Sequence, residues 1–138
     1  MKTPMSLLFS LLFAFTLSAA PSTVLESLDQ GPRWEKLGAR KVKYTIDRDE
    51  ILVTRMDGMF TAIKIKVLKA PIDMMKCTIH FGNGQTQEVA MRNTIRAGGE
   101  TRVIDIPGGA RVIKKVVFWY DTKNAARRRA TVELWGRH

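Results

Sequence analysis

The sequence predicts an all-β fold, namely an antiparallel β-sandwich or jelly-roll-like arrangement of about eight strands. Apolar residues recur with a period of two, as in Ile63, Ile65 and Val67, which alternate with Lys64 and Lys66. Such alternation is typical of a strand with one buried face. No run of about ten or more residues carries the apolar stripe of a helix. Turn dipeptides separate the alternating runs, at Asp57-Gly58, Asn83-Gly84, Gly98-Gly99 and Gly108-Gly109.

The individual strands follow from these runs and turns. The folded part begins near Trp34, after the break at Gly31-Pro32. Strands are predicted at 33–38, 41–46, 50–55, 60–68, 75–82, 85–92, 101–107 and 111–120, with a last strand at 130–136. Alternation supports the later strands through four sets of residues: Cys77, Ile79 and Phe81; Val89 and Met91; Ile104 and Ile106; Val132 and Leu134. A type I′ hairpin turn needs positive φ at both central residues, which Asn-Gly tolerates, so residues 81–85 should join two antiparallel neighbours.

The strand predicted at 111–120 is apolar on both faces. Val116 and Phe118 fall on one face, together with Tyr120, whereas Val117 and Trp119 fall on the other. We therefore expect a central strand whose second face is covered as well. The cover is expected to be the protein's own chain, with a partner or a ligand as the alternatives.

The first 20 residues have the pattern of a secretory signal peptide. Lys2 precedes the apolar run Leu7–Leu17, and small residues follow, so cleavage is expected after Ala19 or Ala20. The run is too short to span a bilayer, which takes about 20 apolar residues. We predict a flexible leader over 21–32 and a single domain over 33–138, exported to a bacterial periplasm or beyond the cell.

Charge and cysteine usage narrow the function further. The net charge of +10 favours anionic partners such as an acidic glycan, a cell-wall polymer or lipid headgroups, although it could also serve solubility alone. Cys77 is the only cysteine, so no intrachain disulfide can form. On its strand it shares the face of Ile79 and Phe81, which indicates a buried apolar role.

The usual catalytic constellations are not apparent. All serines lie at positions 6, 10, 18, 22 and 27, outside the predicted domain, which leaves no serine for a catalytic triad. Cys77 and His80 are three apart on a strand and therefore face opposite sides. With His138 as the other histidine, neither a transition-metal site nor a cofactor is expected.

Carboxylates cluster at Asp47, Asp49 and Glu50 in a predicted turn. Turn capping is the favoured interpretation, and calcium binding is left open. A carboxylate-dependent hydrolase is a minor alternative, because nothing in the sequence pairs two acids.

Aromatic residues interleaved with cations are the best functional signal. The aromatic residues are Trp34, Trp119, Tyr120 and Trp135, and they lie among Lys64, Lys66, Arg111, Lys114, Lys115 and Arg137. Exposed rings could stack on sugars while the cations hold acidic groups; packing of the rings is the alternative. We single out Trp119, Lys64, Lys66, His80 and Arg111 as candidate ligand-binding residues. No nucleic-acid-binding signature is present.

Four segments resemble a family of small secreted bacterial β-sandwich domains of unknown function. They are HFGNG (80–84), IRAGGETRVIDI (95–106), RVIKKVVFWY (111–120) and VELWG (132–136). The resemblance implies an exported all-β domain and assigns no catalytic residues. We therefore expect a non-enzymatic module that binds an anionic envelope component or glycan. A structural subunit, as a homo-oligomer or within an envelope complex, is the alternative.

Overall fold

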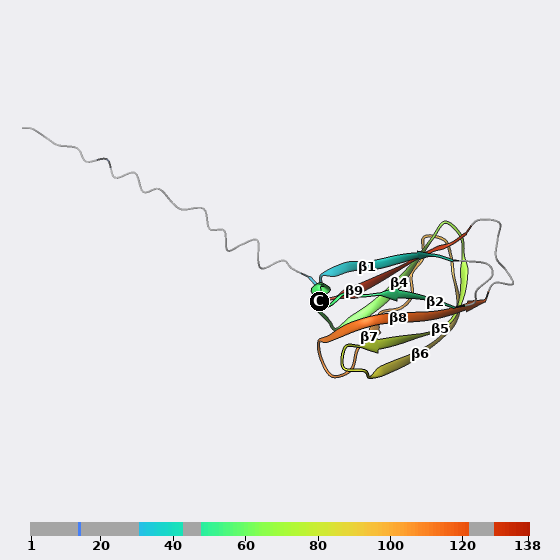
Figure 1. Cartoon of the computed structure of the whole chain (residues 1–138). Coiled ribbons are helices and arrows are strands. Elements are labelled where there is room, and N and C mark those ends of the chain that lie inside the picture. Colours follow the sequence, from blue (N-terminus) through green and yellow to red (C-terminus); the bar gives the residue numbers. More distant parts are fainter. Residues whose placement is uncertain (1–13, 15–30, 43–47, 122–128) are drawn as a thin grey trace, which may run out of the picture. The chain divides into compact units, whose positions relative to one another are not determined.

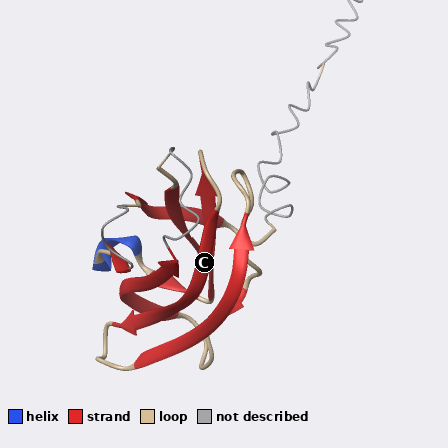
Figure 2. Ribbon diagram, turned by 90° about the vertical axis from the view of Figure 1, so that its right-hand side faces the viewer, coloured by secondary structure: helices blue, strands red, loops and turns tan. Residues whose placement is uncertain are grey.

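The computed structural model describes residue 14 and residues 31–42, 48–121 and 129–138. Nine strands and no α-helix occur in these residues (Figure 1). The strands are β1 (Trp34–Lys41), β2 (Arg48–Leu52), β3 (Met59–Phe60), β4 (Ala62–Leu68), β5 (Ile72–Phe81), β6 (Thr86–Ile95), β7 (Ile104–Asp105), β8 (Arg111–Asp121) and β9 (Thr131–Arg137). One 3-10 turn, Arg55–Asp57, is the blue segment of Figure 2.

The strands form two antiparallel sheets. The four-stranded sheet has the order β1-β9-β4-β7, and the five-stranded sheet has the order β2-β8-β5-β6, with β3 also paired to β8. The two sheets enclose one apolar core. This arrangement confirms the predicted antiparallel β-sandwich.

Several strand boundaries differ from the prediction. Residues 43–46 of the strand predicted at 41–46 lie outside the described residues, and Lys41 ends β1. The strand predicted at 50–55 stops at Leu52. It stops because the Asp57 carboxylate accepts hydrogen bonds from the Thr54 N–H at 2.9 Å and hydroxyl at 3.0 Å, which stabilises a 3-10 turn. The strand predicted at 101–107 is reduced to Ile104–Asp105.

The β5–β6 hairpin forms where Asn83-Gly84 predicted it, but with a different turn. Gly84 has φ +88°, whereas Asn83 does not have a positive φ. The Gly84 N–H donates to the Phe81 carbonyl at 3.1 Å, and the Phe81 N–H donates to the Gln85 carbonyl at 2.9 Å. One left-handed residue therefore suffices, as in hairpins with a glycine bulge, and a type I′ turn is not formed.

The core lies between the sheets and is built from the alternating residues. Its largest fully buried side chains include Tyr120, Phe60, Phe81, Phe118, Ile63, Ile65, Met74, Ile79, Ile113 and Leu134. Val117 is also fully buried but lies outside this core. It pairs with Glu50 of β2 and Thr78 of β5 on the outer side of the five-stranded sheet. The protein's own chain thus covers the second face of β8 at Val117, whereas Trp119 on the same face is only half-buried.

Side chains link the two sheets along the open sides of the sandwich. On one side Arg40 of β1 donates from Nε to the Glu50 carbonyl of β2 at 2.9 Å. On the other side Gln87 of β6 donates to the Asp105 carbonyl of β7 at 3.2 Å. Edge carbonyls of both sheets are thereby occupied.

Gly136 lies where β9 passes close to Phe60, and its replacement by alanine should destabilise the fold. An added Cβ would lie 2.6 Å from Cδ1 of Phe60 and 2.9 Å from Cδ1 of Leu37. Because Phe60 is fully buried, we expect Gly136→Ala to lower the free energy of unfolding by about 1–3 kcal/mol in urea titrations. Gly31→Ala is the control, since no atom lies within 4 Å of its added Cβ. Equal stability of the two variants would show that the side chains around Phe60 shift to accommodate the added methyl group.

Candidate functional site

Lys64 and Lys66 lie on the outer face of the four-stranded sheet, where each covers a tryptophan ring. The Lys64 Nζ lies 4.4 Å from the ring centroid of Trp34 on β1. The Lys66 Nζ lies 4.6 Å from that of Trp135 on β9. Both contacts are within cation–π range. The ring faces are therefore occupied by the protein's own cations.

Most charges of this face are also paired. Lys36 lies 2.6 Å from Glu133, Lys64 lies 3.5 Å from Glu100, and Arg137 lies 3.3 Å from Asp105. The Trp135 Nε1–H donates to Glu133 at 3.3 Å. A surface whose rings and charges are satisfied internally has little to offer a sugar or an anion.

Trp119 and His80 lie on the outer face of the other sheet, so these two candidates do not share a face with Lys64 and Lys66. Lys76 and Arg48 flank the half-buried Trp119 ring, at 4.5 Å and 5.7 Å from its centroid. His80 stands in register with Lys115 and Thr86. Tyr120, grouped with the surface aromatics from sequence, is a core residue.

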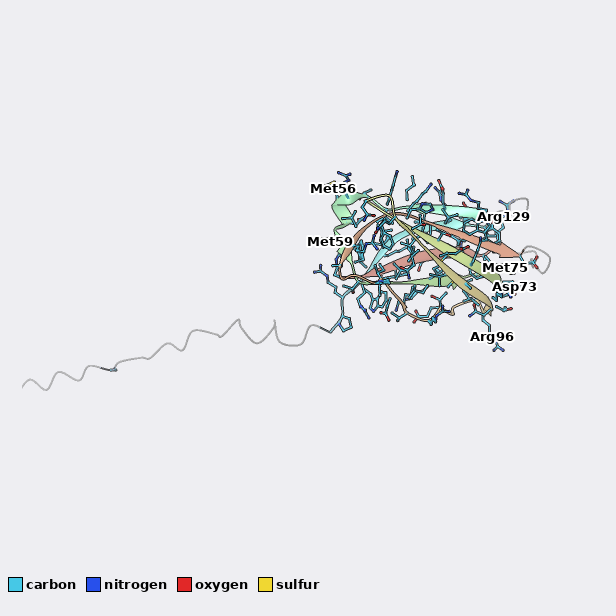
Figure 3. All side chains as sticks on the ribbon, turned by 90° about the horizontal axis from the view of Figure 1, so that it is seen from below. Met56, Met59, Asp73, Met75, Arg96 and Arg129 are labelled. Atoms are coloured by element: carbon cyan, nitrogen blue, oxygen red, sulfur yellow. The ribbon has the colours of Figure 1, made fainter. Side chains whose placement is uncertain are left out.

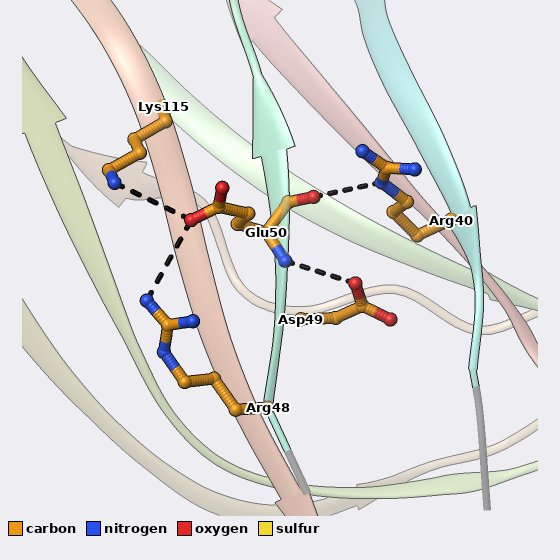
Figure 4. Close-up of polar contacts among 5 residues, drawn as sticks. All are labelled: Arg40, Arg48, Asp49, Glu50 and Lys115. Carbon is orange, nitrogen blue, oxygen red and sulfur yellow. Dashed lines mark hydrogen bonds and ion pairs between the residues drawn. The ribbon is translucent and has the colours of Figure 1, made fainter. Parts of the chain in front are cut away.

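Asp49 and Glu50 of the acidic cluster do not lie in a turn but at the beginning of β2 (Figure 4). Glu50 lies 3.4 Å from Lys115 and 3.7 Å from Arg48, and Asp49 accepts a hydrogen bond from the Glu50 N–H at 3.2 Å. Neighbours on a strand point to opposite faces, so the two carboxylates diverge. Asp47 lies outside the described residues. Within the described part of the chain, no group of three potential metal ligands occurs.

Arg111, at the beginning of β8, has the most unusual surroundings of the candidates. Its guanidinium carbon lies 3.6 Å from the ring centroid of Phe81. Nη2 donates to the side-chain oxygens of Gln85 at 2.6 Å and of Asn83 at 3.3 Å. These partners are neutral, so they orient the guanidinium without cancelling its charge. Among the described residues, no oxygen accepts a hydrogen bond from Nε or Nη1 of Arg111.

Two depressions are lined by this arginine. One of about 460 Å³ is lined by Arg55, Phe81, Gly82, Asn83, Arg111 and Val112. The second, of about 530 Å³, shares Phe81 and Arg111 with it and reaches Gln87 and Pro107. A third depression, of about 150 Å³, shares Arg55, Gly82 and Val112 with the first and is also lined by Lys114. We call Arg55, Arg111 and Lys114 the cationic rim.

The cationic rim is not neutralised by nearby acids. No Asp or Glu among the described residues lines the three depressions, and none forms an ion pair with these three cations within the described chain. The exposed amide side chains of Asn83 and Gln85 add polar groups beside Arg111. The arrangement can hold an anion beside a second polar group of the same ligand.

Arg111 is one of the candidates that the sequence singles out, whereas Arg55 is not. The sequence pattern predicts a strand through Arg55, whereas the Thr54–Asp57 hydrogen bonds turn the chain there. The Thr-x-x-Asp spacing is a capping pattern that could have indicated this turn.

Within the described residues, no helix has the length and apolarity needed to cross a membrane.

Comparison with known proteins places the chain with one family. A domain of unknown function, DUF2541, matches residues 6–136. No curated protein and no solved structure matches the chain. The family description assigns no activity, so functional inference depends on the geometry above.

Cys77 should be inert in the folded protein. It is fully buried in the core, and burial raises the pKa of its thiol to about 12. We expect no reaction with a thiol reagent such as DTNB at pH 8 in native buffer, and one equivalent in urea. Rapid native labelling would contradict the assigned core position.

Glu133 should make stability depend on pH. The hydrogen bond from Lys36 holds the pKa of this carboxyl below its ordinary value. The stabilisation is therefore present above the carboxyl pKa of the unfolded chain and is lost as the pH falls through the lower folded-state pKa.

Urea unfolding of Glu133→Gln should reveal this dependence. We expect the variant to be less stable than the parent at pH 7, with a difference that shrinks in acid. Glu88→Gln is the control, because Glu88 also pairs with a lysine but its side chain is 64% exposed, so its loss should matter less. A deficit of Glu133→Gln that is the same at all pH values would contradict the pKa shift.

Proposed function

Because the chain belongs to the DUF2541 family of domains of unknown function, we propose from its own geometry that it is an exported, non-enzymatic module that binds an anionic envelope component through the cationic rim. The observation that carries this proposal is Arg111, whose guanidinium is held by an aromatic ring and two amide oxygens. A guanidinium oriented in this way binds carboxylate or phosphate with little loss of conformational freedom.

The pairing of charges supports the cationic rim over the four-stranded sheet as the binding surface. On the sheet, Lys64 would have to leave both Glu100 and the Trp34 ring to meet a ligand. Arg111 has no carboxylate partner among the described residues, so it breaks no ion pair when it binds a ligand. Since desolvation and lost pairing count against binding, an anion gains most at the cationic rim.

The chemical class of the ligand follows from the neighbouring amide groups. The side chains of Gln85 and Gln87 line the same depression as Arg111. A ligand with a phosphate or carboxylate next to a hydroxyl group would bind the guanidinium and hydrogen-bond to these amides. Acidic sugars and polyol phosphates of the cell envelope have this combination.

The non-enzymatic part of the proposal is supported by the positions of the acids. Asp49 and Glu50 point to opposite faces of β2, and Glu50 lies against Lys115 and Arg48. These two carboxylates cannot flank one scissile bond as glycosidases require. Cys77 and His80 also diverge, one into the core and the other outward.

Binding of dextran phosphate, with neutral dextran as the reference ligand, tests the proposal. We expect the purified protein to bind the phosphorylated polymer and not the neutral one, with weaker binding at high salt. Arg111→Gln and Arg55→Gln should each weaken binding about tenfold in calorimetric titrations, because each removes a charge-assisted hydrogen bond.

Arg48→Gln is the matched control. It removes the same charge from a cation that is already near Glu50, so its effect should be smaller than twofold. Equal losses for Arg48→Gln and Arg111→Gln would show that net charge alone attracts the polymer. Absence of any binding by the parent protein would overturn the proposal.

A further inference from the structure

Apolar side chains protrude beside the cationic rim. Met56 is 96% exposed, Leu52 61% and Met59 51%. These are three of the five large hydrophobic residues that are exposed in the described chain, and all fall within eight consecutive positions. Concentrated apolar exposure of this kind marks an interaction surface. We call Met56 and Met59 the methionine tip.

The backbone fixes the methionine tip in its exposed position. Met56 is the middle residue of the 3-10 turn, which is held by the Thr54–Asp57 hydrogen bonds. Gly58 follows with φ +89°, and Met59 then pairs with Val112 of β8. The carboxylate of Asp57 is engaged by Thr54, so it is turned toward the backbone of the turn.

The methionine tip and the cationic rim occupy the same end of the domain. Arg55 directly precedes Met56, and Val112, the register partner of Met59, lines the depression shared by Arg55 and Arg111. Figure 3 shows Met56 and Met59 at one end and Met75, Arg96 and Arg129 at the other. Exposed apolar groups are thus flanked by cations that no described carboxylate pairs.

We infer that this end docks on an anionic lipid surface, with the methionine tip in the acyl boundary and the cationic rim on the headgroups. The inference rests on the proposed function and names its ligand as a phosphate headgroup with neighbouring hydroxyls, such as phosphatidylglycerol. A soluble glycan would use the cations and leave the methionines in water. A bilayer interface offers both an apolar phase and anionic groups.

Flotation with vesicles of phosphatidylglycerol and phosphatidylcholine tests the inference. The parent protein should bind these vesicles and not pure phosphatidylcholine. The double variant Met56→Ser/Met59→Ser should bind at least about tenfold more weakly, because the transfer of methionine from water is lost. It should retain the parent affinity for dextran phosphate. Met75→Ser, which removes an exposed methionine at the other end, should bind the vesicles and dextran phosphate as tightly as the parent does.

Depth measurements give an independent readout. A nitroxide can be attached to Met56→Cys or, as the control, to Met75→Cys, because the native Cys77 is buried. We expect the label at position 56 to gain oxygen accessibility and lose nickel-chelate accessibility on vesicles, whereas the label at position 75 does not change.

The outcomes separate the two proposals. Unchanged vesicle binding by Met56→Ser/Met59→Ser, or no change of the label at position 56, overturns the lipid inference and leaves anion binding intact. Parallel losses for vesicles and dextran phosphate also overturn it, because the methionines would then act in the soluble site. If Arg111→Gln weakens neither vesicle binding nor dextran phosphate binding, the proposed function itself fails. Equal thermal midpoints of all variants establish that they are folded.

Discussion

The pairing of β8 with β5 is the constraint on which the rest of the domain depends. β8 is bonded to β2 and β3 as well as to β5, and it is buried on both faces over part of its length. Phe118 faces the core. Val117 lies on the outer side, between its register partners Glu50 and Thr78 on the two neighbouring strands. The register that brings Phe81 opposite Ile113 also brings Arg111, two residues earlier, over the Phe81 ring. The same pairing that closes the core therefore orients the guanidinium.

Local pattern explains what could be predicted from the sequence. Alternation assigns each residue to a face of its own strand, so the core positions of Ile63, Ile65 and Cys77 follow directly. It does not say in which sheet the strand lies. Lys64 and Trp119 therefore looked like members of one surface, although their strands belong to different sheets. Arg55 was missed for another reason, because a side-chain hydrogen bond to Thr54 ends the strand before it. Non-local pairing and single capping bonds are not visible in a period-of-two pattern.

The cations of this basic chain differ in whether an acidic side chain pairs with them. On the four-stranded sheet, cations such as Lys36 and Arg137 serve the fold, since each lies against an acid. At the opposite extreme stands Arg111, whose partners are a ring and two amides. The net charge of +10 therefore overstates the positive charge that is free to meet an anion, because the paired cations contribute to it. Position and pairing, more than the total, decide where an anion gains free energy.

The side-chain bonds across the open sides of the sandwich bear on how the protein behaves when crowded. Sheet margins with free carbonyls recruit strands from other molecules and begin fibre growth. Arg40 and Gln87 occupy carbonyls at Glu50 and Asp105, and the β6 margin is further distorted at Arg92, which has φ +41°. A strand from a neighbouring copy would meet an interrupted ladder on both sides. These contacts therefore disfavour strand addition by a neighbouring copy, and the protection involves no disulfide.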